Sequence, residues 1–169
     1  MKQIPVFYDP RMVTNSRSYS PSSGKPAAVV ESWKALGIPI EIAEVHPVTV
    51  AHLKRAHDPA FVDAILQGVQ DNGFGNRLPE VSASLPYTSG AMLSAARRAI
   101  ANQRVAVAPC SGFHHARYDH CDDYCTFNGL IVTAQALKAE GLVKRVGILD
   151  FDMHYGNGTD DCIDRLRLS

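Results

Sequence analysis

Short β-prone runs alternate with segments of helical spacing along this chain, and that alternation leaves few architectures open. The β-prone runs cover residues 6–8, 40–45, 104–108 and 146–150. Helices are expected over residues 27–36, 49–56, 89–102 and 130–140, with one more that begins at Asp58-Pro59. Strands that alternate with helices are typical of α/β proteins, in which helices connect parallel strands. The sequence therefore predicts an α/β fold with a parallel sheet.

The run from Val146 to Asp150 is almost entirely apolar, which predicts a central strand buried on both faces. Residues 14–26 are rich in Ser and Pro, and residues 71–79 in Gly and Asn, so both segments are predicted to be surface loops. No internal repeat or interdomain linker divides the 169 residues. A chain of this length can bury one sizeable core, and we expect residues 1–169 to form a single domain.

Charge and cysteine content argue against several functions. The chain has 17 Lys+Arg and 17 Asp+Glu residues, so it has no overall basic field and we expect no nucleic-acid partner. No apolar run is long enough to cross a bilayer, and we expect no membrane association. Four cysteines without a CxxC pair are too few for a disulfide scaffold, so we expect a cytoplasmic protein with reduced thiols.

Two polar clusters directly follow predicted strands, where the active sites of open α/β sheets gather. The first cluster, residues 111–116, contains the adjacent His114 and His115. Histidines in such a loop can be metal ligands, acid/base groups or ordinary surface residues. The pair alone does not decide between these three interpretations.

The second cluster, residues 149–159, contains Asp150, Asp152 and His154 at a spacing of two. In extended backbone this spacing places all three side chains on one face. Two carboxylates at the end of an apolar strand repel each other, so a cation or a protonated partner is needed nearby. A divalent metal would supply that charge, and zinc or another first-row metal suits this donor set. The alternative is a capping and turn sequence in which the two carboxylates hold loop amides.

Three motifs occur in a fixed order: His114-His115-Ala116, Tyr124-Cys125-x-Phe127-Asn128, and Asp150-x-Asp152-x-His154-x-Gly156-Asn157-Gly158-Thr159. Their order and spacing resemble those of the zinc-dependent histone deacetylase superfamily, which includes bacterial acetylpolyamine amidohydrolases. Weaker agreement extends over residues 56–62 and 79–99. The resemblance spans nearly the whole chain but only the N-terminal half of the family's domain. It implies a three-layer α/β/α, arginase-like fold with a parallel sheet, here truncated to the first four strands.

The resemblance also implies an activity, which is removal of an acetyl group from an acetylated amine such as acetyl-lysine or an acetylpolyamine. Asp152 and His154 would be zinc ligands. His115 would be the general base on a zinc-bound water, and would then protonate the leaving amine. His114 would be its electrostatic companion.

Further residues would support this chemistry. Asp150 would accept a hydrogen bond from His114, and Asn157 would accept one from His115. Asp150 would also contribute to a potassium site, which such enzymes often hold. Tyr124 would line the acyl channel.

The sequence departs from the family's pattern at the channel rim. Asp123 stands where the family usually has Gly, and it forms an acidic segment with Asp119 and Asp122. This segment could attract a cationic substrate, or it could be an ordinary solvated loop.

The third zinc ligand and the oxyanion-stabilising Tyr of the family would lie beyond Ser169. We therefore expect a fragment, a half completed by a complementing chain or a homo-oligomer, or a degenerate remnant. A catalytically incomplete half-domain that binds metal or a partner chain is the alternative function. An arginase-like hydrolase with two metals is disfavoured by the His114-His115 and Tyr124-Cys125 pairs.

Overall fold

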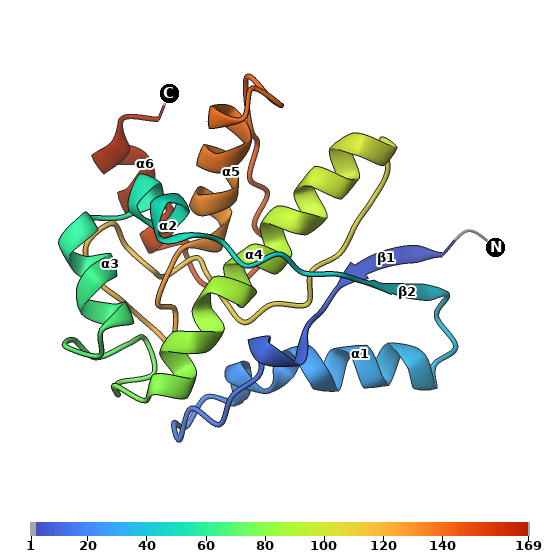
Figure 1. Cartoon of the computed structure of the whole chain (residues 1–169), viewed down its shortest axis with the longest axis horizontal. Coiled ribbons are helices and arrows are strands. Elements are labelled where there is room, and N and C mark those ends of the chain that lie inside the picture. Colours follow the sequence, from blue (N-terminus) through green and yellow to red (C-terminus); the bar gives the residue numbers. More distant parts are fainter. Residues whose placement is uncertain (1–2, 169) are drawn as a thin grey trace.

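The computed structural model describes residues 3–168 and contains a parallel two-stranded sheet among helices (Figure 1). Strand β1 (Ile4–Phe7) pairs with β2 (Ile40–Ala43), so that Val6 lies opposite Ile42. Between the strands come two short 3-10 helices, η1 (Pro10–Met12) and η2 (Pro21–Ser23), and then α1 (Lys25–Ala35). The predicted α/β class with a parallel sheet is confirmed.

The predicted third strand, residues 104–108, is wrong as a full strand. Only Val107 pairs with the sheet, through a parallel bridge to Val6 on the edge of β1 opposite β2. The amide of Phe7 donates to the Val107 carbonyl (2.8 Å), and the Val107 amide donates to the Pro5 carbonyl (2.9 Å). Its neighbour Val105 is exposed, and no described segment pairs with the outer side of this run.

The predicted buried strand at residues 146–150 is also wrong for the described part of the chain. This segment forms no ladder there, and Leu149 is 79% exposed. Only Ile148 packs against the main core. Burial on both faces requires neighbouring strands, and within residues 3–168 no strand lies beside this run. The expected set of four strands is thus two paired strands, one bridge and one unpaired segment.

Five more helices follow the sheet: α2 (Val50–Ala56), α3 (Pro59–Leu66), α4 (Pro79–Asn102), α5 (Gly129–Ala139) and α6 (Asn157–Leu166). The helices expected from residue 49 and from Asp58-Pro59 are present, and the side chains of Thr49 and Asp58 accept backbone hydrogen bonds as the N-caps of α2 and α3. Helix α4 begins at Pro79, ten residues before the expected start at Ser89. Pro86 lies inside the helix and does not end it. In Figure 1, α4 runs diagonally through the molecule and contacts both β1 and α5.

The main hydrophobic core lies between α2, α3, α4 and α5. Its fully buried side chains include Leu53, Val62, Leu93, Ile131 and Val132. Gly90 of α4 lies so close to residues 46 and 47 that a Cβ would overlap with the His46 carbonyl oxygen. The absence of a side chain at Gly90 therefore permits close packing of α4 against the chain that follows β2.

A fully buried histidine, His57, joins this core to the loops around the polar clusters. Its Nδ1 donates to the Arg117 carbonyl (2.9 Å), and its Nε2 accepts the Asn128 amide (2.9 Å). Because Nε2 accepts a hydrogen bond, the ring is neutral with its proton on Nδ1. Burial lowers the pKa of His57 to about 4.

We expect His57 to make the fold sensitive to acid. Its folded pKa lies below its unfolded value, so its stabilisation is complete above pH ~6.5 and is lost as pH falls toward about 4. Between pH 7 and pH 5 the loss in unfolding free energy should be about 2 kcal/mol. Urea unfolding at both pH values measures it, with His57→Gln as the comparison. An equal pH dependence in His57→Gln would contradict this expectation.

Candidate functional site

The loop that carries His114 and His115 is held by the beginning of α6. The amides of Gly158 and Thr159 both donate to the His114 carbonyl, at 2.9 and 3.0 Å. A Cβ at position 158 would overlap with the backbone carbonyl groups of His115 and Ala116. Glycine is therefore required where α6 meets the histidine loop. This contact brings together the two polar clusters identified in the sequence.

Each histidine donates from Nδ1 to an acceptor in the second cluster. His114 bonds to Asp150 Oδ2 (2.8 Å), and His115 bonds to Asn157 Oδ1 (2.6 Å). The Asn157 amide is oriented by its neighbours, since its Nδ2 donates to Asp122 (3.1 Å) and its Oδ1 accepts the Gly158 amide (3.0 Å). The proton of neutral His115 must therefore lie on Nδ1, which leaves a lone pair on Nε2.

Asp150 lies behind His114 and is suited to remain ionised. The backbone amide of Asp152 donates to its Oδ1 (3.0 Å), and this bond, together with the contact to His114, lowers the pKa of Asp150. The carboxylate accepts the Nδ1 proton of His114 and so fixes the orientation of this ring. The two histidine rings lie side by side, with centroids 4.0 Å apart.

Asp152 and His154 lie beside this pair. Asp152 Oδ1 is 3.9 Å from His114 Nε2 and 2.9 Å from His154 Nδ1. The His154 amide donates to the same carboxylate (2.8 Å) and is the main cause of the lowered pKa of Asp152. Asp150 and Asp152 thus also hold loop amides, as the turn interpretation predicted. They do not cap α6, whose N-cap is Gly156.

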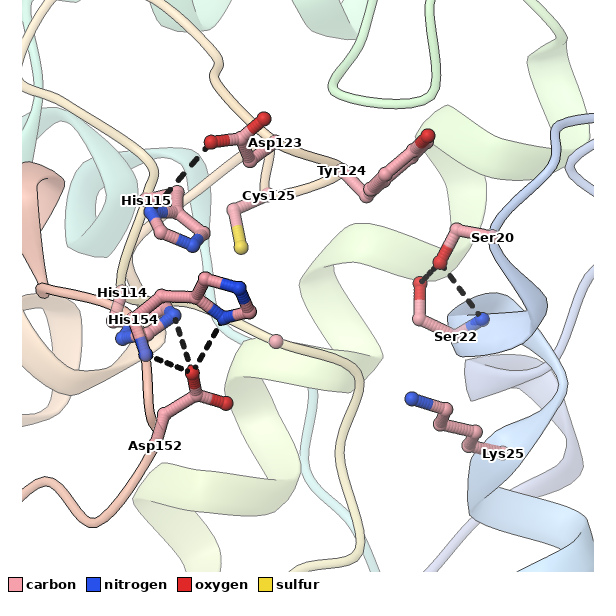
Figure 2. A pocket seen from close by; sticks show the side chains of 11 residues that line it. Ser20, Ser22, Lys25, His114, His115, Asp123, Tyr124, Cys125, Asp152 and His154 are labelled. Atoms are coloured by element: carbon pink, nitrogen blue, oxygen red, sulfur yellow. Dashed lines mark hydrogen bonds and ion pairs between the residues drawn. The ribbon is translucent and has the colours of Figure 1, made fainter.

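These groups face a cavity of about 340 Å³ (Figure 2). It is lined by Ser20, Ser22, Lys25, Gly112, His114, His115, Asp123, Tyr124, Cys125, Asp152 and His154. The predicted channel residues Asp123 and Tyr124 are both present in its wall. Their φ values are 39° and 65°, in the left-handed region that favours glycine. Asp123, which stands where the family usually has Gly, therefore adopts a backbone conformation that is strained for a residue with a side chain.

The sequence did not indicate the wall formed by Ser20, Ser22 and Lys25, which are the N-cap of η2, a residue of η2 and the first residue of α1. They lie in a segment predicted only as a loop, and no spacing pattern links them to the histidines. Cys125 was noted only as part of a motif. Burial raises the pKa of its thiol to about 11, so it remains protonated at neutral pH.

The donor chemistry at the cavity suits zinc in part. A carboxylate from Asp152 and an imidazole from His154 are common zinc ligands, and both line the cavity. Within residues 3–168, however, no group of three or more His, Cys, Asp or Glu side chains could hold a metal. These residues therefore supply two donors, whereas catalytic zinc sites commonly have three protein ligands.

The fold and the paired histidines opposite a carboxylate–histidine loop define the arginase/deacetylase class of α/β hydrolases. The family model for the histone deacetylase domain matches residues 22–166, and the chain belongs to this family.

None of the helices in the described part of the chain is long and apolar enough to span a membrane.

Two relatives and one solved structure show the extent of the similarity. The chain is 28% identical over 141 residues to histone deacetylase 14, chloroplastic, of Arabidopsis thaliana, which covers 72% of this chain and 33% of the relative. It is 36% identical over 123 residues to acetylpolyamine amidohydrolase 2 of Pseudomonas aeruginosa, covering 63% and 36%. The HDA15 HD domain superposes with a TM-score of 0.80 at 22% identity, covering 96% and 51%. The chain therefore spans between a third and a half of these proteins.

Proposed function

We propose that this chain forms the N-terminal half of an amidohydrolase domain that removes an acetyl group from an acetylated amine, such as acetyl-lysine or an acetylpolyamine. The observation that carries the proposal is the His115–Asn157 hydrogen bond, which leaves His115 Nε2 as a proton acceptor in a 340 Å³ cavity. The names of two relatives, a histone deacetylase and an acetylpolyamine amidohydrolase, support this reaction class.

In this mechanism His115 Nε2 takes a proton from the attacking water and returns one to the leaving amine nitrogen. Asn157 acts as a positioning residue, because it fixes the ring and its tautomer. His114 acts as the electrostatic companion of His115, whose ring lies 4.0 Å away between centroids, and Asp150 holds His114 in place through its Nδ1. Tyr124 and Asp123 form the rim that the substrate chain passes.

We also propose that Asp152 and His154 contribute to a zinc site and that Asp150 contributes oxygen to a potassium site. Bound zinc would polarise the amide carbonyl and lower the pKa of water, which the histidines alone cannot do. The donor types and their positions in the cavity wall support the zinc assignment. A cytoplasmic location is a further proposal, supported by the four unpaired thiols.

The test uses the protein as its native source makes it, after its intact mass has been measured. We expect acetate release from acetyl-lysine peptide or N-acetylputrescine to stop when a chelator removes the metal and to return with zinc. Asp152→Asn and His154→Ala should each weaken zinc binding by roughly 100-fold, measured by competition with a zinc dye. The control is His120→Ala, an exposed histidine paired with Asp119. Unchanged zinc affinity in both site variants would contradict the ligand assignment.

A second candidate function is a metal-binding or partner-binding half-domain without catalysis. Two observations favour it, namely the donor pair rather than a triad in the described residues and the high exposure of Phe151 (87%) and Met153 (90%) beside the site. It predicts zinc binding that depends on a partner chain. It also predicts that His115→Ala leaves the biological function intact.

A further inference from the structure

The wall of the cavity opposite the histidines carries positive charge. Lys25 lines this wall, and Figure 2 shows its ammonium group pointing into the cavity from the side opposite His114 and His115. Within residues 3–168, the Lys25 ammonium group makes no hydrogen bond or ion pair, whereas the histidine side of the cavity carries the carboxylates of Asp123 and Asp152. The two walls are therefore of opposite charge.

Two serine hydroxyls accompany the ammonium group. Ser20 Oγ donates to Ser22 Oγ (3.0 Å), so the hydroxyl proton of Ser22 is left to point elsewhere, and no acceptor for it occurs in the described chain. Ser22 is buried, and both serines line the cavity. A hydroxyl proton and an ammonium group on one wall are hydrogen-bond donors that suit an anionic oxygen.

Buried contacts hold the backbone of this wall, residues 20–25, in place. Ser23, which follows Ser22, donates from Oγ to Ser16 Oγ (3.0 Å), and both are buried. The Asn76 side chain in turn donates to the Ser16 carbonyl (2.8 Å). Pro26, next to Lys25, is buried as well. The donors therefore start from a fixed backbone, which lowers the entropic cost of binding a ligand.

We infer that Lys25 and Ser22 form a carboxylate-binding subsite in which Ser20 positions Ser22, and that the substrate is an acylated amine that also carries a carboxylate, such as a free acyl-amino acid. The inference rests on the proposed function, because it places the amide at His115. An acetylpolyamine that crossed the cavity would bring its second ammonium group to Lys25, which is unfavourable. A carboxylate at the same position would pair with it.

Three probes of similar length separate these possibilities: 4-acetamidobutanoate, N-acetylputrescine and neutral N-acetylbutylamine. We expect the protein to favour the carboxylate probe over the neutral one by about fivefold in kcat/KM, as a partly exposed ion pair allows. Lys25→Gln should remove this preference, and Lys25→Glu should reverse it in favour of N-acetylputrescine. The matched control is Lys34→Gln, an exposed lysine near the other end of α1, which should keep the wild-type ratio.

Direct binding of the same probes, measured by titration calorimetry, separates failure of the subsite from failure of the proposed function. If no probe is hydrolysed but 4-acetamidobutanoate binds in a Lys25-dependent way, the subsite is supported and the hydrolase proposal is not. If the probes are hydrolysed with ratios that Lys25→Glu does not change, the subsite is overturned and the hydrolase proposal stands. Binding that is equal for all three probes would also overturn the subsite.

Discussion

Replacing His115 with alanine is expected to lower kcat for hydrolysis of an acetylated amine by about 10²–10⁴-fold, the range for loss of a general base. The physical reason is the free Nε2 of His115, which the hydrogen bond from Nδ1 to Asn157 (2.6 Å) leaves as the proton acceptor in the cavity. KM should change little, because the substitution removes proton transfer in the transition state and leaves the contacts that bind the substrate in place. Steady-state kinetics of acetate release measures both constants.

The matched control for this substitution is His120→Ala. His120 is exposed and pairs with Asp119 (2.8 Å) outside the cavity wall, so its loss should leave kcat within about twofold, as for most surface substitutions. Both variants should unfold at the wild-type urea midpoint. Wild-type turnover by His115→Ala would reject the role proposed for this histidine and would favour the half-domain without catalysis.

Replacing Gly158 with alanine is expected to have the largest effect on stability. Its new Cβ would overlap with the His115 and Ala116 carbonyl groups, so α6 or the histidine loop must move. Overpacking of this kind costs about 1–3 kcal/mol, and the two amide bonds to His114 would be strained as well. Urea unfolding measures the loss, and the imidazole NMR signals of His114 and His115 report the displaced loop.

Gly147→Ala is the control for this second prediction. A Cβ at position 147 has no heavy atom within 4 Å, and the residue has no left-handed φ. The substitution should be neutral or slightly stabilising, since alanine restricts the unfolded chain. Equal stability of Gly158→Ala and wild type would show that α6 does not lock the histidine loop.

Local sequence patterns predicted most of the helices, because helix formation depends on hydrogen bonds and side chains that are close together in the sequence. Helices were expected from residue 49 and from Asp58-Pro59, and the structure has them there, with the Thr49 and Asp58 side chains accepting backbone hydrogen bonds as N-caps. The run at 146–150 shows where such reasoning fails. Its apolar composition predicts burial, yet burial depends on neighbours that no local pattern supplies, and Leu149 is exposed.

The candidate site was predicted unevenly for a similar reason. Motif order led to His114, His115, Asp150 and Asn157, and the structure contains both hydrogen bonds that the family resemblance implies. Lys25 could not be found in this way. It reaches the cavity only because the chain from η2 to α1 lies across the cavity from the histidines, which is a property of the tertiary fold.

The hydrogen bonds of the two histidines have a consequence for the order of folding. His114 and Asp150 are separated by 36 residues, and His115 and Asn157 by 42. Closing loops of this length carries an entropic cost, which must be met before the contacts form. Hydrogen bonds within each helix join residues only about four apart, so the histidine pairs are expected to form after the individual helices, together with the long-range contacts between α2 and α5. The time at which the Gly158 and Thr159 amides become protected from hydrogen exchange during refolding would therefore report when the site has formed.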